Sequence, residues 1–516
     1  MNHPNIVFIV LDTLRADRIF SDYKNRSLTP TISSLLNNSI YFKNCIAQSP
    51  YTLPSHISMF TGLYPSQNYL ISKDLFKLSG KIPILTEILK NMGYITICYT
   101  ENPFISKIYG LTKGFDKVFQ NFKRNLNSNR AFKNFQIINY LNKIDAYSEK
   151  KIGSKPLLKI LHRNKMRILT IIEYIIKKLI WRKNIVLKYR DTLTELDKLS
   201  QLLKHNNKDN SFYLFFNIMA THHPYIPIKE VSDYFGIKIK DFRKIKNFFF
   251  DFYKYVLMLN EKYKKLSKKK DIILKKLYNA CVFYNDLIVE RILTILKKFG
   301  LLENSYIIIT SDHGEHLGDQ FDHYLWGHAT LQSVYESVIK VPLLIYNSNF
   351  KKKIIKNQVE LKDLFHTILH LTGINGTKNK YFDLAKSIIN QTNTNSTPEY
   401  IFGEYLKSKK NLKKIFNTYQ KFIIRSLILK QKNNIYFLRT QSYKLINFNN
   451  KYEEFYNLVD DPHELINNVN ENDVNYRKLK IKMKEFIKNN ENTEKLKELI
   501  TNKEKDLVRS ITRILH

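Results

Sequence analysis

Short runs of apolar and β-branched residues recur along this chain, and they constrain its fold more than any other feature. They cover residues 5–11, 94–99, 212–218, 306–310 and 341–346. Each run lacks the alternation of polar and apolar residues, which predicts strands buried on both faces, as in a parallel sheet covered by helices. Helical patterns lie between them, for example at 84–92 and 282–298. Alternating strands and helices predict a layered α/β domain.

The character of the chain changes towards its C-terminal part. We expect residues 1–388 to form a large domain with a mostly parallel central sheet. The Asn- and Thr-rich stretch 389–397 is interpreted as a linker. Residues 389–516 are expected to form a smaller α+β subdomain, with short strands at 401–405, 422–429 and 435–438 and a charged helical tail from about 472.

Two basic stretches, near 120–200 and 230–275, interrupt the alternation and are interpreted as insertions, chiefly helical, in the large domain. The chain has 84 Lys and Arg against 46 Asp and Glu, a formal net charge of +38. Such an excess suggests nucleic acid or an anionic membrane as a partner. The alternative, which we favour, is a compositional bias, because the excess runs along the whole chain and is not confined to one short arm. The basic residues are dispersed and carry no nucleic-acid-binding motif, so no specific nucleic acid is expected. Residues 155–190 predict either peripheral contact with an anionic membrane or an amphipathic helix packed on the domain, and we favour the second.

Cysteine usage and hydropathy bear on the compartment. The three cysteines, Cys45, Cys98 and Cys281, are far apart and form no disulfide framework. No segment reaches the roughly 18–20 consecutive apolar residues of a membrane span. The first residues lead directly into the strand before Asp12, so no signal peptide is expected. These features predict a cytoplasmic protein.

Two of the predicted strands end in polar clusters. The first cluster begins at Asp12 and the second contains Asp312 and His313. Functional groups gather at the carboxyl ends of strands in open α/β sheets, and two carboxylates with an imidazole suit Mn²⁺, Zn²⁺ or, with more oxygens, Ca²⁺. The alternative for each Asp is a helix cap or a turn residue. The nearby Glu315, His316 and His323 are interpreted as exposed loop residues or as partners of the ligands.

Thr52 supplies a hydroxyl in a third segment. Pro54 fits the first turn of a helix, and the apolar spacing after it continues that helix. Thr52 would then stand at a helix N-terminus, where N–H groups and the helix dipole favour an anion. The alternative is a Thr that only caps the helix.

Six segments, taken together and in order, resemble the sulfatase family of the alkaline-phosphatase superfamily. They lie between residue 5 and about residue 470, and the two basic stretches have no counterpart among them. The segments are the strand ending in Asp12-Thr-Leu-Arg-Ala-Asp17; Thr52-x-Pro-Ser-x4-Phe-Thr-Gly-x-Tyr-Pro65; Asn102-Pro-Phe with Gly110-Leu-x-x-Gly-Phe-Asp116; Thr221-His-His-Pro-Tyr-x-Pro227; Ser311-Asp-His-Gly-Glu-x-Leu-Gly-Asp319, which continues through Trp326-Gly-His328, Tyr335-Glu336 and Lys340-Val-Pro-Leu343; and Phe455-Tyr-Asn-Leu-x-Asp-Asp-Pro-His-Glu-x-x-Asn467.

The resemblance implies one divalent metal ion held by Asp12, Thr52, Asp312 and His313, with Ca²⁺ or Mn²⁺ favoured and Zn²⁺ open. It also implies that Thr52 is the catalytic nucleophile. His222 and His328 would be catalytic residues that flank the group being transferred, and Asn102 is expected to face the same pocket.

The sequence departs from the family pattern at three of these positions. Sulfatases normally carry Cys or Ser, oxidised to formylglycine, where this chain has Thr52, so no formylglycine is expected. His56 stands where an Arg usually follows Pro-Ser. His328 stands where many sulfatases carry Lys, and it could protonate the leaving oxygen or bind the anion.

The predicted function is therefore that of a metal-dependent hydrolase of sulfuric, phosphoric or phosphonic esters. The expected partner is an anionic sulfate or phosphate ester. The alternative is a transferase that moves a phospho-alcohol or sulfo group onto a glycan or lipid at a membrane surface. A non-enzymatic binding protein is a third hypothesis, and the Asp, Asp-His and Thr set argues against it.

Overall fold

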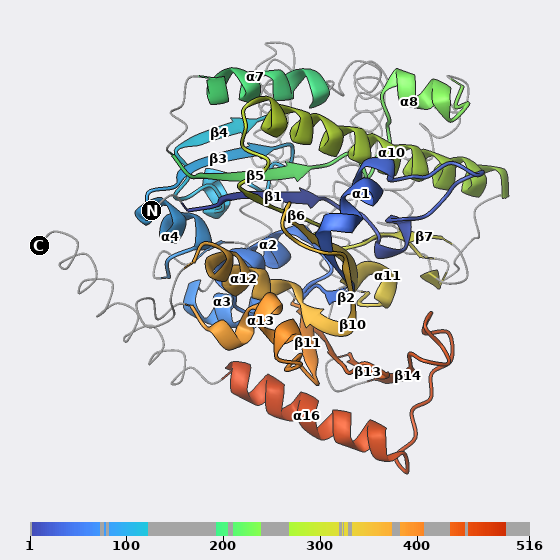
Figure 1. The fold of residues 1–516 in the computed structure, drawn as a ribbon. Helices are drawn as coiled ribbons and strands as arrows, with labels where there is room; N and C mark the ends of the chain where they lie inside the picture. The colour runs from blue at the N-terminus through green and yellow to red at the C-terminus, as the bar shows by residue number, and fades with distance from the viewer. Residues whose placement is uncertain are drawn as a thin grey trace, which may run out of the picture.

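A central sheet of eight strands organises the computed structural model (Figure 1). The structure describes residues 3–72, 77–78, 82–121, 192–204, 210–238, 268–318, 322–323, 325–328, 333–373, 382–406, 434–448 and 452–491. The strands follow one another across the sheet as β10 (Lys353–Glu360), β2 (Ser39–Ile46), β9 (Lys340–Tyr346), β6 (Ser305–Thr310), β1 (Asn5–Leu11), β5 (Phe212–Ile218), β3 (Ile95–Thr100) and β4 (Lys117–Gln120). β9 runs antiparallel to β2 and β6, and the remaining pairs are parallel. The predicted α/β class with a mostly parallel sheet is confirmed.

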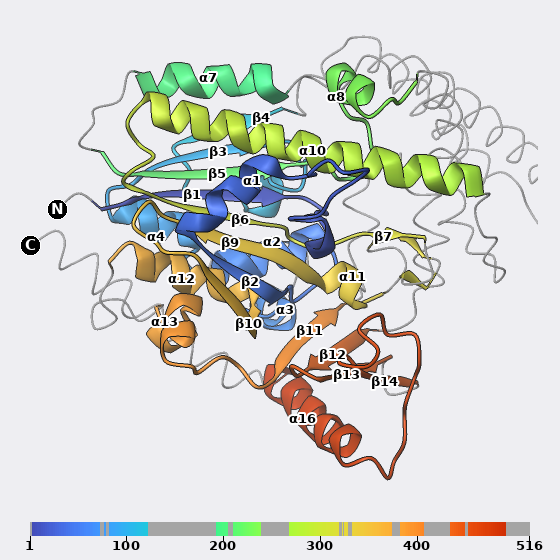
Figure 2. The same cartoon turned by 45° about the vertical axis from the view of Figure 1, so that its right-hand side comes forward.

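Helices cover both faces of this sheet (Figures 1 and 2). One layer contains α1 (Pro30–Leu35), α7 (Thr192–Lys204), α8 (Lys229–Tyr234) and α10 (Lys268–Lys298). The other contains α2 (Thr52–Thr61), α3 (Pro65–Ser72), α4 (Leu85–Asn91), α12 (Leu364–Leu371) and α13 (Ile388–Asn393). Short helical turns join these elements, namely η1 (Ala16–Arg18), η2 (Leu36–Asn38), η3 (Lys107–Tyr109), η7 (Leu361–Asp363), η8 (Leu384–Lys386) and α11 (Glu336–Ile339).

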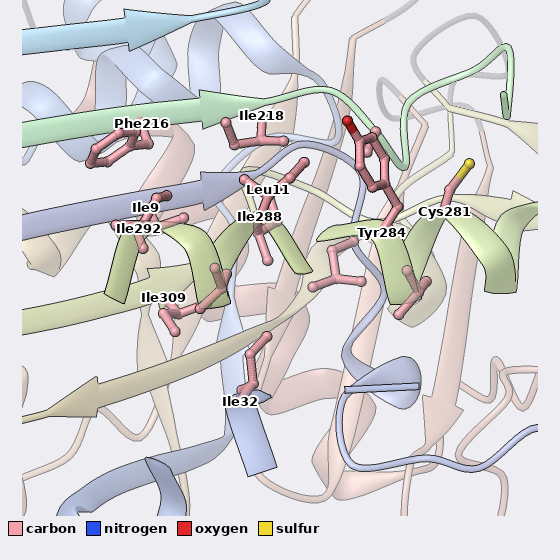
Figure 3. Packing of buried hydrophobic residues seen from close by; sticks show 14 of the residues in the cluster. Ile9, Leu11, Ile32, Phe216, Ile218, Cys281, Tyr284, Ile288, Ile292 and Ile309 are labelled. Carbon is pink, nitrogen blue, oxygen red and sulfur yellow. The ribbon is translucent and has the colours of Figure 1, made fainter. Parts of the chain in front are cut away.

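Strand β1 shows why the apolar runs are continuous. Val7, Ile9 and Leu11 pack in the core beneath α10, whereas the alternate residues Phe8 and Val10 pack in the core on the opposite side. Successive side chains of a strand point to opposite faces, so a strand covered on both sides needs an apolar residue at every position. Figure 3 shows the first of these faces, where Ile9 and Leu11 pack with Ile288 and Ile292 of α10.

A second sheet of four antiparallel strands follows in the chain. It contains β11 (Ile401–Tyr405), β12 (Ile435–Arg439), β13 (Tyr443–Asn447) and β14 (Glu453–Asn457). One face packs on α16 (Val474–Glu491), and the other packs on residues of the large unit such as Ile46 and Ile339. The predicted smaller sheet with a helix after it is therefore present.

The stretch 389–397 is not simply a linker, because residues 388–393 form α13. Ile388 and Ile389 of this helix are buried in the same core as α12. A division of the chain at residue 388 stays a prediction, and α13 packs with the large unit. The predicted strand at 422–429, most of the two basic stretches and the segment 155–190 lie outside the described residues. Among the helices that are described, none has the length and apolar character needed to cross a membrane.

Candidate active site

The carboxyl ends of β1 and β6 lie next to each other because these strands are paired in parallel. Asp12 follows the last residue of β1, and its backbone N–H donates to the carbonyl oxygen of Ile218 at the end of β5. Asn102, just beyond β3, donates from Nδ2 to Asp12 Oδ2 at 2.7 Å. Three neighbouring strands therefore fix the position of one carboxylate, which is fully buried.

Asp312 and His313 follow β6. Nδ1 of His313 lies 2.9 Å from the carbonyl oxygen of Gly314, and because a carbonyl only accepts, the ring donates from Nδ1. The neutral ring then carries its lone pair on Nε2, the arrangement of a histidine that binds a metal. Nε2 lies 3.5 Å from Asp312 Oδ2 and 3.9 Å from Asp12 Oδ1.

Thr52 is the first residue of α2. Its Oγ1 lies 3.4 Å from Nε2 of His313, and the residue is 4% exposed. The helix is tied to the end of β6 because the Ser55 hydroxyl donates to the carbonyl oxygen of Asp312 at 2.6 Å. Pro54 occupies the first turn, where a missing N–H costs no helical hydrogen bond, as the sequence predicts.

His56 lies one turn further along α2 and is fully buried. Its Nδ1 donates to the carbonyl oxygen of Thr52 at 2.9 Å and lies 3.5 Å from Asp312 Oδ2. Its Nε2 accepts from Asn217 Nδ2 at 3.2 Å. The ring therefore joins the helix that carries Thr52 to the strand end that carries Asp312.

The donor set at this point fits a divalent cation. Asp12, Asp312 and His313 each offer one ligand atom, and the three atoms lie within 4.8 Å of one another. Asp12 Oδ1 and Asp312 Oδ2 are buried and accept no hydrogen bond within the part of the chain that the structure describes. Buried carboxylate oxygens without donors are costly unless a cation lies between them. Burial raises the pKa of Asp312 and lowers that of His313 to about 3, so the His313 imidazole supplies no positive charge.

Two further histidines stand beside this group. The ring of His328 lies 4.4 Å from that of His313 and 5.1 Å from that of His222, measured between centroids. Burial, followed by the neighbouring His222, lowers the pKa of His328 to about 3. His328 Nδ1 lies 3.0 Å from Glu315 Oε1, and burial raises the pKa of that carboxyl to about 7.

A buried ion pair holds the loop that carries His328. Strands β7 (His316–Leu317) and β8 (Trp326–Gly327) form a short hairpin. Arg15, which follows β1, donates to both oxygens of Asp322 at 2.9 and 2.8 Å and to the carbonyl oxygen of Glu315 at 3.0 Å. Burial alone would raise the pKa of Asp322, but the Arg15 guanidinium brings it well below the usual value. The hairpin is thereby fastened to the end of β1.

The structure brings together all six site residues expected from the sequence, namely Asp12, Thr52, His222, Asp312, His313 and His328. For Glu315 and His316, which the sequence interpretation gives as exposed loop residues or as partners of the ligands, the structure excludes the exposed alternative. Both are fully buried: Glu315 contacts Nδ1 of His328 at 3.0 Å, and His316, in β7, contacts the Ser333 hydroxyl at 2.9 Å. Asn217 was missed: it is the one polar residue in an otherwise apolar strand, and that exception was the available signal.

The sequence matches the Sulfatase family model over residues 4–374. A sulfatase of Formosa agariphila is 30% identical over 195 residues, which are 37% of this chain and 32% of that protein. The chain thus aligns with about a third of the length of this relative. An arylsulfatase of Clostridium perfringens is 22% identical over 504 residues, covering 90% of each chain.

Solved structures show the same fold. The phosphonate monoester hydrolase of Agrobacterium radiobacter has a TM-score of 0.62 at 15% identity, with 94% of this chain and 95% of that chain covered. A structure in complex with its substrate D-glucosamine-2-N,6-O-disulfate has a TM-score of 0.59 at 17% identity, covering 96% and 98% of the two chains. The family match covers well over half of the sequence. The chain belongs to the sulfatase family.

Proposed function

We propose that this enzyme hydrolyses a sulfuric, phosphoric or phosphonic ester through direct attack by the hydroxyl of Thr52. The observation that carries the proposal is the position of Thr52 Oγ1, 3.4 Å from Nε2 of His313. The same Nε2 lies 3.5 Å from Asp312 Oδ2 and 3.9 Å from Asp12 Oδ1, two buried oxygens that accept no hydrogen bond among the described residues. A cation there would be held by Asp12, Asp312 and His313 together with Thr52. A divalent ion supplies a lower pKa for the hydroxyl and offsets negative charge in the transition state.

The chain's own residues account for the remaining chemistry. Thr52 Oγ1 forms a bond to sulfur or phosphorus while the bond to the ester oxygen breaks. The pair His222 and His328 is suited to carry the hydroxyl proton to the leaving oxygen, because the two rings lie side by side next to His313. Asn102 keeps Asp12 turned towards the site.

The metal proposed is Mn²⁺ or Ca²⁺, with Zn²⁺ as the alternative, since one imidazole among oxygen ligands suits each of them. The substrate proposed is an anionic ester. Two similar proteins motivate it, one described as a phosphonate monoester hydrolase and the other bound to a disulfated glucosamine. The transferase alternative is not proposed, because the first of these proteins is named a hydrolase and the segment 155–190 lies outside the described residues.

Turnover of three 4-nitrophenyl esters tests the proposal. The sulfate, the phenylphosphonate and the bis(4-nitrophenyl) phosphate are assayed after chelation and reloading with Mn²⁺, Ca²⁺ or Zn²⁺. Thr52→Ala should lose at least roughly 10³-fold in kcat/KM, the scale expected when a nucleophile is removed. Thr61→Ala is the matched control, because Thr61 is a buried Thr of the same helix whose hydroxyl donates to the carbonyl oxygen of Ile57. Turnover that survives the loss of Thr52 overturns the assignment.

A further inference from the structure

The replacement of an oxidisable residue by Thr52 creates a chemical requirement in the second half of the reaction. A formylglycine hydrate releases its sulfate by collapsing back to the aldehyde, and a Thr has no such route. An ester of Thr52 is cleaved only when water attacks sulfur or phosphorus. That water must lose a proton, so a Thr-based enzyme needs a group that accepts it.

The imidazole of His56 bonds the carbonyl oxygen of Thr52 through Nδ1 and Asn217 through Nε2. His222 and His328 stand beside His313, and they differ in what supports them. Nδ1 of His222 lies 2.7 Å from the carbonyl oxygen of His223, a neutral acceptor. Nδ1 of His328 lies 3.0 Å from a carboxylate oxygen of Glu315. A carbonyl and a carboxylate both hold the proton on Nδ1 and leave the lone pair on Nε2. Only a carboxylate also balances the charge of the ring once Nε2 takes a second proton.

Glu315 is held rigidly enough to play this part. Its side chain is fully buried, whereas the side chain of His328 is 15% exposed. Its backbone is fixed on both sides, because its N–H donates to the carbonyl oxygen of Ser337 at 3.2 Å and its own carbonyl accepts from Arg15 at 3.0 Å. The carboxylate thus comes from the buried side of His328.

We propose that Glu315 is a positioning residue that orients His328 and makes it the proton acceptor for the water that frees Thr52. The inference rests on the proposed function, since it requires a covalent ester of Thr52. The water oxygen forms a bond to sulfur or phosphorus while the bond from that atom to Thr52 Oγ1 breaks. The water proton goes to Nε2 of His328, and a proton then returns from this ring to Thr52 Oγ1, which restores the hydroxyl.

The role of Glu315 differs from that of the ion pair between Arg15 and Asp322. Arg15 and Asp322 fasten the hairpin, so their loss would disturb the position of the whole loop. Glu315→Gln instead keeps the size of the side chain and an oxygen that accepts from Nδ1, and removes only the charge. Its expected effect with a 4-nitrophenyl ester falls mainly on cleavage of the Thr52 ester, because 4-nitrophenolate leaves without a proton at pH 8, whereas the attacking water must give its proton to His328.

Stopped-flow kinetics with 4-nitrophenyl phenylphosphonate at pH 8 test the proposal in the metal-loaded enzyme. The ester forms with release of 4-nitrophenolate, and its cleavage follows. In Glu315→Gln we expect a burst of about one 4-nitrophenolate per active site and a steady-state rate roughly 10²-fold below that of the wild type, the lower end of the contribution of a proton-transfer group. Mass spectrometry of the quenched variant should find the phenylphosphonyl group on the peptide that contains Thr52.

Two other variants make the test selective. His328→Asn should also accumulate the adduct, because 4-nitrophenolate leaves at pH 8 without a proton and His222 remains to accept the proton of Thr52. This variant keeps the proposal testable if Glu315→Gln does not fold. Asp286→Asn changes a buried carboxylate of α10 in the same way and should show wild-type kinetics without an adduct.

The outcomes separate this inference from the proposed function. The inference is overturned if Glu315→Gln turns over like the wild type, or if its burst and steady-state rates fall together with no adduct, while Thr52→Ala is inactive. The proposed function itself fails if Thr52→Ala remains as active as the wild type.

Discussion

The imidazole of His313 lies 3.5 Å from the carboxylate of Asp312, and neither group donates to the other. His313 gives its proton to the carbonyl oxygen of Gly314, so two electron-rich atoms face each other in a fully buried place. Such a contact stores unfavourable free energy that a cation between the two atoms relieves. The arrangement suits a metal ion, and it lowers the free energy of unfolding of the metal-free protein.

Asp312→Asn should raise the stability of the metal-free protein and abolish its affinity for the metal. The amide of Asn can donate to Nε2 of His313, so the free energy of unfolding of the metal-free protein should rise by about 1 kcal/mol, the usual value of one hydrogen bond. Mn²⁺ at 100 times its Kd should stabilise the wild type by about 2.7 kcal/mol and leave the variant unchanged. Chemical unfolding with and without Mn²⁺ measures both effects. A variant that is still stabilised by the metal would rule out Asp312 as a ligand.

The strands that the sequence predicted and those that it missed differ in exposure. Residues 212–218 form β5 as predicted because both faces are covered. β2 was missed because the exposed Lys43 and the polar Asn44 interrupt its apolar run, and β10 because it is an edge strand with exposed residues in its first half. The interpretation of residues 389–397 as a linker fails at α13, because Asn and Thr have low helix propensity and the helix forms through burial of Ile388 and Ile389.

The residues of the site could be predicted from the sequence more completely than the contacts that hold them in place. Asp12 and Asp312 end neighbouring parallel strands, and that arrangement follows from the sequence pattern. The contact between Glu315 and His328 depends on the fold of the hairpin, and no pattern of residues thirteen apart predicts it. His56 was noted only as an exception to the family motif, while the structure gives it a partner on β5.

Gly314→Ala should remove the metal site by displacing the turn after His313. A Cβ at this position would lie 2.1 Å from the carbonyl oxygen of Ser337, a backbone atom that is fixed by α11. We expect a loss of several kcal/mol, at the upper end of the effects of single substitutions, together with loss of bound metal.

Gly300→Ala is the control for this substitution. Gly300 has a positive φ of 66°, and a Cβ there would contact nothing within 4 Å. The expected cost is only the roughly 1–2 kcal/mol of a left-handed backbone conformation, with the metal content unchanged. Thermal unfolding and elemental analysis compare the two variants. Equal metal content in the two variants would show that the turn at Gly314 is not needed for metal binding.

His56→Ala should destabilise the fold more than loss of a surface histidine does. The substitution leaves a cavity and removes the partner of Asn217 Nδ2, so we expect a loss of about 2–4 kcal/mol. His370→Ala is the control, since His370 is only partly buried and bonds the Ser387 hydroxyl at 2.8 Å; its expected cost is about 1 kcal/mol. Urea unfolding measures both losses. Similar losses for the two variants would show that His56 contributes no more to the stability of the fold than a partly buried histidine does.

Asp286 lies on α10 and contacts the start of α1, and it should make the stability of the protein fall as the pH rises from about 4 to about 6. The carboxylate accepts the N–H groups of Thr31 and Ile32 at 2.8 and 2.9 Å. Burial, opposed by these hydrogen bonds and assisted by Glu290, raises its pKa to about 6. The folded state therefore holds a proton that the unfolded state has already lost above about pH 3.9. The stabilising effect of that proton is complete below this pH and is lost as the pH rises through 6.

The size of this effect follows from the shift of about two pKa units, which corresponds to about 3 kcal/mol. Asp286→Asn has no such proton, so the difference in unfolding free energy between wild type and variant should change by that amount between pH 4 and pH 7. Taking the difference removes the contribution of other groups that titrate in the same range. Burial raises the pKa of this carboxyl, and the two N–H groups lower it. A difference that stayed constant with pH would mean that these hydrogen bonds fully compensate the burial.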